Sequence, residues 1–318
     1  MTNIQKSYQT SKAVNKTAKV SWKIFRALLL IGLSFIILYP LIYMVSMAFR
    51  PQDQIYDPSV IWVPKAFTLD NVKQALEMMN YKDAVLLTLR LNIVSSLLQL
   101  LVCAITGYSF ARFEFRGKNI MFALAVFSIL VPPQIISTPL FMQFKDFNFF
   151  GFGSIIGLFT GTPATVNLID SPLTYYLTAI FGAGIKSGLF IFIFRQFFKG
   201  LPKELEDAAA IDGCGFFSTF VRIIIPNSLV VFVMAFLLSS VWYWNDYFTA
   251  SMFMRNVETV SISLVRIANM SALDTLDPYK MLTVLQAGCL LSILPILILF
   301  LALQRFFIQG VERSGIVG

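Results

Sequence analysis

The sequence predicts an all-α membrane protein in which six helical segments cross the bilayer. Hydrophobic residues make up 57% of the 318 residues, charged residues make up 13%, and the mean hydropathy is +0.73. Soluble domains carry about 25% charged residues, so this composition is typical of a chain whose surface faces lipid. Apolar stretches of roughly 20 residues, the length that crosses the hydrocarbon core, alternate with polar segments.

These stretches predict a cytoplasmic tail at 1–26, a six-span domain at 27–303 and a second cytoplasmic tail at 304–318. The predicted spans are Ala27–Phe49, Leu91–Ala111, Ile120–Met142, Tyr175–Phe198, Leu229–Tyr247 and Met281–Leu303. The predicted connections are outside loops at 50–88, 143–174 and 251–280 and a cytoplasmic loop at 199–226. Proline predicts a kink in the first span at Pro40 and a break in the third at Pro132-Pro133.

Lysine and arginine predict the orientation of these spans. The first tail is rich in lysine, and the cytoplasmic pieces together hold more Lys and Arg than the longer outside pieces. The first apolar run is too long for a cleaved signal peptide, so we interpret it as a signal-anchor span. Both termini are therefore expected on the cytoplasmic side. The run Phe152–Phe159 is too short to cross and predicts outer-face or re-entrant structure.

Residue types that are missing from the sequence exclude several kinds of chemistry. The chain has no histidine, which excludes His-dependent catalysis and His-ligated metals, and no GxxxxGK[ST] phosphate loop. Its cysteines, Cys103, Cys214 and Cys289, are scattered and indicate neither a disulfide framework nor a metal site. We expect no catalytic residue, metal or cofactor in this chain, and any ATP chemistry must come from another chain. The net charge of +8 fits membrane topology, so no nucleic-acid partner is expected.

The most informative polar segment runs from Leu201 to Pro226. Pro202 suits the first turn of a helix, and the acids that follow it suit the positive end of the helix dipole. Asp212-Gly213 then predicts a turn, and a second amphipathic run ends at Pro226. We therefore predict a short helix, a tight turn and a second short helix on the cytoplasmic side.

This segment resembles the EAA loop of permease subunits of ATP-binding-cassette (ABC) importers. The Glu-Ala-Ala core of that loop corresponds to Asp207, Ala208 and Ala209, and its glycine to Gly213. Its Ile-x-Leu-Pro ending corresponds to Ile223, Ile225 and Pro226. Asp207 is one methylene shorter than the family's glutamate, which leaves its partner open, whereas Ile225 for leucine is nearly neutral.

Further motifs are similar to the carbohydrate branch of these importers, which includes the maltose-type permeases. They are VPPQ at 131–134, RQFF at 195–198, WND at 244–246 and QRFFIQG at 304–310. The resemblance runs from about residue 20 to the end, and only part of 161–181 looks inserted. The motifs occur in the family's order around the EAA-type loop, which makes them a strong signal together.

The resemblance implies a six-helix type I importer bundle in a prokaryotic plasma or inner membrane. It implies a second homologous permease, two ATP-binding subunits that carry ATP and magnesium, and an extracellular sugar-binding protein as partners. The residues expected to couple the permease to the ATPase are Glu204, Asp207, Ala208, Ala209, Asp212, Gly213, Ile225 and Pro226. Small Ala208 and Ala209 would permit close seating on the ATPase, and Asp207 would offer a charge to an arginine there.

Four residues are candidates for the substrate path, namely Lys186, Trp244, Asn245 and Asp246. A lysine deep in a span is costly in lipid, so Lys186 is expected to face protein or a cavity, either as a structural contact or as a donor to sugar hydroxyls or a uronate. Trp244 fits an interfacial belt as well as a sugar platform. Asn245 and Asp246 either line the entrance or cap their helix.

The sequence therefore favours a non-enzymatic permease that moves a sugar or oligosaccharide by alternating access. Two alternatives remain open. The same machinery could carry a non-sugar solute, because no residue shows sugar-specific chemistry. A self-sufficient secondary transporter is the other alternative, although such folds usually show internal repeats and intramembrane acids.

Overall fold

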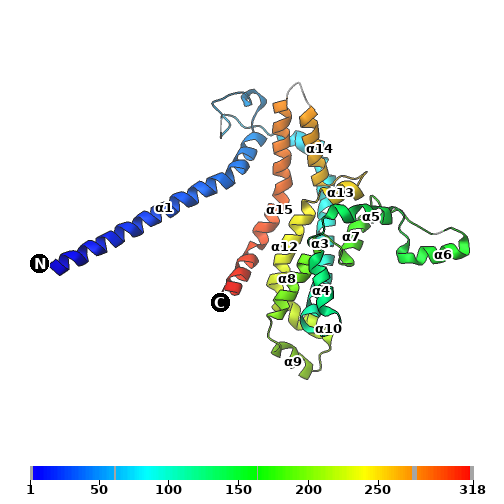
Figure 1. Cartoon of the computed structure of the whole chain (residues 1–318). Helices are drawn as coiled ribbons and strands as arrows, with labels where there is room; N and C mark the ends of the chain where they lie inside the picture. Colours follow the sequence, from blue (N-terminus) through cyan, green and yellow to red (C-terminus); the bar gives the residue numbers. More distant parts are fainter. Residues whose placement is uncertain (1–2, 61, 163, 274–277, 316–318) are drawn as a thin grey trace. The chain divides into compact units, whose positions relative to one another are not determined.

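The computed structural model describes residues 3–60, 62–162, 164–273 and 278–315, and these residues form helices joined by turns and loops (Figure 1). The described part of the chain contains no sheet, and its single isolated β-bridge pairs Phe147 with Val166. The predicted all-α class is confirmed.

Long helices and short helical turns follow one another along the chain. The first half holds α1 (Asn3–Ala48), the 3₁₀ turn η1 (Gln52–Gln54), α2 (Asp70–Met78), α3 (Tyr81–Arg112), α4 (Lys118–Phe127), α5 (Pro133–Lys145), η2 (Phe149–Gly151) and α6 (Phe152–Thr160). The second half holds α7 (Leu173–Ile180), α8 (Ser187–Lys199), α9 (Glu204–Ile211), α10 (Phe216–Thr219), the π-helical turn η3 (Phe220–Ile224), α11 (Ile225–Asn227), α12 (Leu229–Trp244), α13 (Phe248–Phe253), α14 (Val260–Leu273) and α15 (Pro278–Gly315).

Three described helical stretches, Lys19–Ala48, Tyr81–Arg112 and Tyr279–Phe306, are long and apolar enough to cross a membrane. A fourth crossing is possible through the bent pair formed by Phe216–Asn227 and Leu229–Trp244. The first, second, fifth and sixth predicted spans fall on these helices. Each of the other two falls on a pair of shorter helices, and the total of six crossings remains a prediction.

The third and fourth predicted spans are each divided into two helices. The third is interrupted between α4 and α5, and α5 begins at Pro133, so the predicted break is confirmed. The fourth was expected to be one continuous helix and is not, because α7 ends at Ile180 and α8 begins at Ser187. Gly182 at φ 70° and Lys186 at φ 58° adopt the left-handed conformation, which an α-helix cannot contain.

The chain forms two compact units, which we call the terminal unit and the core unit. The terminal unit comprises Met1–Gln74 and Ser271–Leu290, and the core unit comprises Ala75–Met270 and Leu291–Gly318. In the terminal unit, the buried Asn71 donates through Nδ2 to the carbonyl oxygens of Ala48, at 3.2 Å, and Arg50, at 2.8 Å. These bonds fix the chain where it leaves α1.

The core unit is built on the contact between α3, α8 and α12. Phe190, Phe194 and Phe198 of α8 are fully buried against these neighbours. At Gly107 of α3, an added Cβ would lie 2.7 Å from the Cβ of Phe194, so only glycine permits this approach of the two helices. Small residues at helix contacts serve this purpose in membrane bundles, where van der Waals packing holds helices together.

Candidate functional site

A cavity of about 410 Å³ opens in the core unit where the broken helices meet. Its walls come from the α4–α5 break, α5, α7, the α7–α8 break and the end of α12 with α13. The lining residues are Ser128, Ile129, Val131, Pro133, Gln134, Ile136, Ser137, Leu140, Tyr175, Thr178, 182–188, Tyr243, Asp246, Phe248, Thr249 and Phe253. Its volume lies in the usual range for small-molecule sites, roughly 300–1,000 Å³.

Close packing of the α7–α8 break shapes one wall of this cavity. An added Cβ at Gly184 would lie 2.5 Å from the Oη of Tyr243, and one at Gly188 would lie 2.3 Å from the carbonyl oxygen of Ala125. Glycine is therefore required at both positions. The buried Gln99 of α3 donates through Nε2 to the carbonyl oxygen of Ile185, at 2.7 Å, and to Ser187 Oγ, at 3.0 Å. The first of these bonds satisfies a backbone carbonyl that has no helical partner, as the membrane interior demands.

Lys186 lies at the end of this break, directly before α8. Its side chain is exposed and lines the cavity. Within the described parts of the chain, its ammonium group makes no ion pair or hydrogen bond. The sequence predicts that it faces protein or a cavity, and in the structure it is among the residues that line this cavity. The sequence also places it inside a continuous helix, which the structure replaces by a turn.

Asp246 also lines the cavity, and its carboxylate is held by neighbouring groups. Tyr175 Oη donates to Asp246 Oδ2 at 2.8 Å, and the backbone N–H of Thr249 donates to Oδ1 at 3.1 Å. Lys186 and Asp246 are the charged residues among those that line this cavity. Because Asp246 already has donors, Lys186 is the charge in the wall that is available to a ligand.

The other two candidates for the substrate path do not line the cavity. Trp244 is buried, and its indole Nε1 donates to the carbonyl oxygen of Ser292 at 2.8 Å, so its side chain packs inside the core unit. Asn245 is exposed, and its Nδ2 donates to the carbonyl oxygen of Val241 at 2.8 Å. That bond satisfies the last turn of α12, so the capping interpretation fits Asn245.

Sequence reasoning missed three residues of the cavity region. Tyr175 and Tyr243 line it, and Gln99 holds its wall. The tyrosines lie in apolar runs that look like ordinary spans. Gln99 gave a usable signal, because a glutamine in the middle of a membrane span needs a polar partner.

The loop 201–226 forms the helix, turn and helix that the sequence predicts. The backbone N–H of Cys214 donates to the carbonyl oxygen of Ala209 at 2.9 Å, and that of Gly213 to Ala210 at 3.1 Å. This bond pair is the Schellman motif, which places a left-handed residue after the helix, and Gly213 has φ 77°. Pro202 lies two residues before α9 begins, slightly outside the predicted first turn.

The second half of the loop continues into the membrane helix that follows it. Pro226 was expected to end the second helix, but it lies in the first turn of α11, and the helical path continues to Asn227. A missing N–H is harmless at the start of a helix, which explains why Pro226 is tolerated there. The chain then bends by 79° into α12. Ile225 packs on the aromatic core of the core unit, so it serves the loop's own packing.

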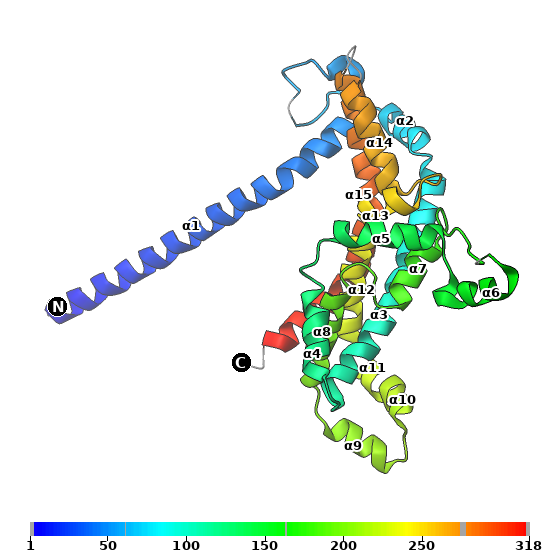
Figure 2. The same ribbon diagram turned by 45° about the vertical axis from the view of Figure 1, so that its right-hand side comes forward.

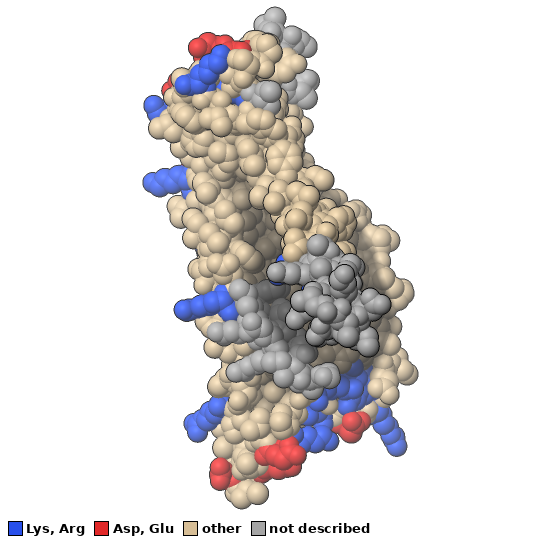
Figure 3. Space-filling view, turned by 90° about the vertical axis from the view of Figure 1, so that its left-hand side faces the viewer, with Lys and Arg blue, Asp and Glu red and all other residues tan. Residues whose placement is uncertain are grey.

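The two alanines expected to face a partner lie on different sides of α9. Ala209 is 2% exposed and is packed inside the core unit, so it is not available to another chain in this conformation. Asp207, Ala208 and Gly213 are exposed, as are Glu204 and Asp212. Ile211, which sequence reasoning overlooked, is 87% exposed. Acidic side chains gather at the α9 end of the core unit in Figure 3.

An ion pair connects α9 to the end of α3. Arg112 Nε donates to Glu206 Oε1 at 2.6 Å, and their side chains are 7% and 22% exposed. The Arg112 Nη2 donates to the carbonyl oxygen of Leu201 at 2.8 Å. The neighbouring Tyr108 packs between Phe198, Phe216 and Phe220 at ring distances of 5.0–5.5 Å. Arg112 and Tyr108 therefore fix the loop on α3.

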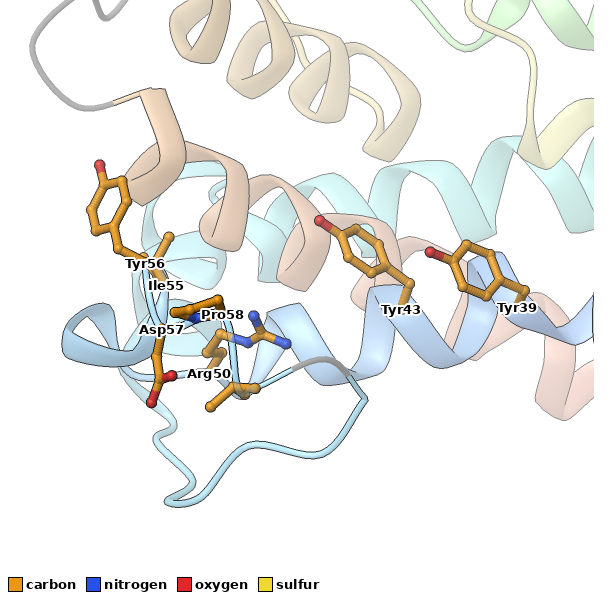
Figure 4. Close-up of a pocket in the computed structure, with 8 residues that line it drawn as sticks. Tyr39, Tyr43, Arg50, Ile55, Tyr56, Asp57 and Pro58 are labelled. Atoms are coloured by element: carbon orange, nitrogen blue, oxygen red, sulfur yellow. The ribbon is translucent and has the colours of Figure 1, made fainter.

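A smaller cavity, about 300 Å³, lies within the terminal unit (Figure 4). Tyr39, Tyr43, Arg50 and Asp57 are among its lining residues. Lys65 Nζ donates to Asp57 Oδ2 at 2.5 Å, and this bond holds the pKa of that carboxyl well below its ordinary value. The carboxylate is thus occupied by its own loop, which makes this hollow the weaker candidate for binding.

Comparison with known proteins identifies the class of this chain. It belongs to the family described as Binding-protein-dependent transport system inner membrane component, which matches residues 84–313. The chain is 29% identical to the arabinooligosaccharides transport system permease protein AraQ of Halalkalibacterium halodurans, over 90% of this chain and 93% of that protein. It is 27% identical to the maltodextrin transport system permease protein MdxG of Bacillus subtilis, over 95% of this chain and 99% of that protein.

A solved structure shares the fold. It is that of a bacterial ABC transporter involved in the import of the acidic polysaccharide alginate. The TM-score is 0.70 at 20% sequence identity, and the match covers 91% of this chain and 98% of the solved chain. Together with the family match, this similarity confirms the predicted fold class, the all-α permease of a type I importer.

Family membership decides between the classes that the sequence left open. The chain is a permease component of an ABC importer in the inner membrane, and it is not itself an enzyme. ATP hydrolysis belongs to separate ATPase subunits, and a substrate-binding protein serves the importer. The resemblance drawn from the EAA-type loop is confirmed, and the self-sufficient transporter is excluded.

Proposed function

We propose that this permease moves an oligosaccharide through the cavity between its broken helices, and that the loop 201–226 receives the motion of the ATPase. The relatives named for arabino-oligosaccharides and maltodextrin support a sugar as cargo, and the alginate importer, which shares the fold, supports an acidic one. The observation that carries the proposal is the cavity wall, in which Lys186 offers an ammonium group beside tyrosine, serine and threonine hydroxyls.

Such a wall suits sugars for a physical reason. Sugar hydroxyls both donate and accept hydrogen bonds, and serine, threonine and tyrosine hydroxyls do the same. A lysine ammonium only donates, and it binds a carboxylate more strongly than a neutral hydroxyl because the bond is charge-assisted. Lys186 therefore gives the path a preference for uronate-containing oligosaccharides over neutral ones.

Lys186→Met is expected to reduce uptake of an acidic oligosaccharide by a factor of roughly 10 to 100, because one charge-assisted bond contributes about 1.5–3 kcal/mol. Uptake of a neutral oligosaccharide of the same length should fall much less. The measurement is uptake of both labelled sugars in cells, with the amount of assembled transporter determined by co-purification of its subunits.

Lys186→Arg serves as the matched control, since it keeps the positive charge and should keep the preference for the acidic sugar. Unchanged uptake of every sugar by Lys186→Met would contradict the substrate role. A variant that no longer assembles would instead make Lys186 a structural contact.

The partners and orientation complete the proposal. A second homologous permease, two ATPase subunits that hold ATP and magnesium, and an extracellular sugar-binding protein would form the transporter. Both termini and the loop 201–226 would lie in the cytoplasm. Asp207 and Ile211 are exposed on α9 and would contact the ATPase, with Asp207 facing an arginine there.

Single cysteines test the orientation in a chain freed of its native cysteines. A cysteine at Ser218 should resist a membrane-impermeant thiol reagent in intact cells, and one at Ser59 should react. Permeabilised cells provide the control, because both positions should then be labelled. Reaction of Ser218→Cys from outside intact cells would overturn the orientation and the coupling role of the loop together.

A further inference from the structure

The last helix of the chain, α15, contains a proline in its middle. Pro295 lies four residues after Leu291 within this helix. In an α-helix the backbone N–H of position 295 would donate to the carbonyl oxygen of Leu291, but proline has no N–H. The helix is long and apolar enough to cross the membrane of this family, where no water takes the place of a missing donor. The Leu291 carbonyl therefore needs a donor from another part of the chain.

Tyr81, the first residue of α3, supplies that donor. Its Oη donates to the Leu291 carbonyl oxygen at 2.8 Å, although 210 positions separate the two residues in the sequence. The accepting carbonyl is the one whose helical partner Pro295 removes, so the tyrosine hydroxyl replaces the missing backbone N–H. A tyrosine at the start of a span also suits an interfacial belt, but a belt residue has no need of this particular acceptor.

Trp244 holds the same turn of α15 from a second helix. Its indole Nε1, which can only donate, bonds the carbonyl oxygen of Ser292 at 2.8 Å, and its side chain is 4% exposed. The end of α12, where Trp244 lies, is beside α15 in both Figure 1 and Figure 2. Two successive carbonyls near the proline are therefore bonded from outside the helix, one by α3 and one by α12. This contact gives the tryptophan of the WND motif a role away from the cavity.

The position of this turn connects it to the rest of the core unit. The part of α15 that belongs to the core unit begins at Leu291, so the turn lies where the helix enters that unit. Trp244 directly follows Tyr243, and Asp246 comes two residues later; both of these neighbours line the cavity. The chain around Trp244 thus belongs to the cavity wall, while its indole bonds α15. A movement of α15 at this turn would reach the wall through that bond.

We propose that Pro295 forms a hinge in α15 and that Tyr81 and Trp244 are the residues that position it. A helix bends most readily where a proline has removed a backbone hydrogen bond. The two side-chain donors hold the hinge in the conformation described here. Ser292 Oγ is buried without a hydrogen-bond partner in the described part of the chain, so it offers Trp244 a second acceptor when the helix pivots. Only the link from the hinge to the sugar path rests on the proposed function.

Restoring the backbone N–H tests whether Tyr81 replaces it. Tyr81→Phe should reduce the fraction of transporter that stays assembled after heating in detergent by a factor of about 2 to 10, because the Leu291 carbonyl loses its donor. In a Pro295→Ala chain the backbone supplies that donor, so adding Tyr81→Phe should have little further effect. Tyr176→Phe is the matched control, because the buried Tyr176 Oη has no hydrogen-bond partner among the described residues, and its removal should be neutral in both chains.

Two outcomes of this comparison would overturn the role of Tyr81. They are an equal loss from Tyr81→Phe in both chains and no loss in either. Pro295→Leu also restores the N–H, and it repeats the test if the smaller alanine prevents assembly.

The pivot itself is measured with a pair of spin labels, on cysteines that replace Tyr279 and Leu124 in a chain freed of its native cysteines. Both side chains are exposed, one on α15 and the other on α4. The helix from Tyr279 to Pro295 is about 24 Å long, so a pivot of about 10° moves the first label by about 4 Å. The distance between the labels should change by about this amount when a non-hydrolysable ATP analogue binds the assembled transporter, and by much less in Pro295→Ala.

An equal change of distance in both chains would show that Pro295 makes a fixed bend, and the hinge would be wrong. Neither the heating experiment nor the distance measurement uses a sugar. Unchanged uptake by Lys186→Met would therefore contradict the proposed sugar path and leave the hinge untouched, so the two failures are distinguishable.

Discussion

Replacing Gly213 with valine is expected to abolish ATP-driven uptake while the permease still reaches the membrane in normal amounts. Gly213 has φ 77° and no atom within 4 Å of an added Cβ, so the substitution meets no steric clash. Its cost is confined to the backbone, at about 1–2 kcal/mol for a left-handed residue with a Cβ. Relief of that strain would open the Schellman turn and change the angle at which α9 leaves it.

Asparagine supplies a matched control, because it tolerates the left-handed region better than other non-glycine residues. Gly213→Asn should keep most of the uptake that Gly213→Val loses. Uptake of labelled oligosaccharide, membrane level by immunoblot and stimulation of ATP hydrolysis by the binding protein are measured together. Wild-type uptake by Gly213→Val would show that this turn does not couple the permease to the ATPase.

Asp207→Lys should reduce ATP-driven uptake about as strongly as Gly213→Val does, but for a different reason. The carboxylate is exposed, so reversing its charge leaves the chain's own packing intact and removes the contact proposed with the ATPase. Asp207→Glu, which restores the residue type of the family loop, should retain uptake. Normal transport by Asp207→Lys would contradict the charged contact.

Breaking the Arg112–Glu206 pair is expected to uncouple ATP hydrolysis from uptake. Removing one partner leaves a largely buried charged group without its hydrogen bond, which costs about 1–3 kcal/mol. In Arg112→Ala, the loop 201–226 would lose two links to α3, since the bond to the carbonyl of Leu201, before α9, goes as well as the pair with Glu206 in α9. We expect ATPase activity that no longer responds to the binding protein, and little uptake.

A double-mutant cycle separates the contribution of the ion pair to uptake from the other effects of changing Arg112 or Glu206. Glu206→Arg and Arg112→Glu should each lose uptake when made alone, and the two changes together should recover part of it. Recovery should be partial, because a glutamate cannot donate to the Leu201 carbonyl. Equal uptake by the wild type and both single variants would remove the pair from the coupling machinery.

Local signals in the sequence predicted the loop well. The Asp212-Gly213 pair indicated the turn, and Gly213 adopts the conformation that only glycine enters freely. The same reasoning could not tell Ala208 from Ala209, because it fixed the helix but not the face that turns inward. Burial of Ala209 depends on where α9 docks, and that is decided by Arg112, about ninety residues earlier in the chain.

The cavity was harder to predict for a related reason. Lys186 stood out because a charge in an apolar run is costly. The run around it was nevertheless interpreted as one helix, since hydropathy does not show where a helix breaks. Gly182, Gly184 and Gly188 were visible, but the need for the last two arises from Tyr243 and Ala125, which approach from elsewhere in the fold. Contacts between distant segments therefore explain most of what the sequence did not reveal.

Two helices, α8 and α12, join the cavity to the loop 201–226, and each has the geometry of a rigid lever arm. Leaving the cavity at Lys186, α8 leads to the loop, and α12 returns from the loop toward Asp246 over 16 residues, about 24 Å of helix. A rotation of about 5° of such an arm displaces its far end by about 2 Å. The shared phenylalanine packing on α8 and α12 keeps the arms stiff. A small tilt of α9 would thus change the distance between Lys186 and Asp246 without any side chain having to relay it.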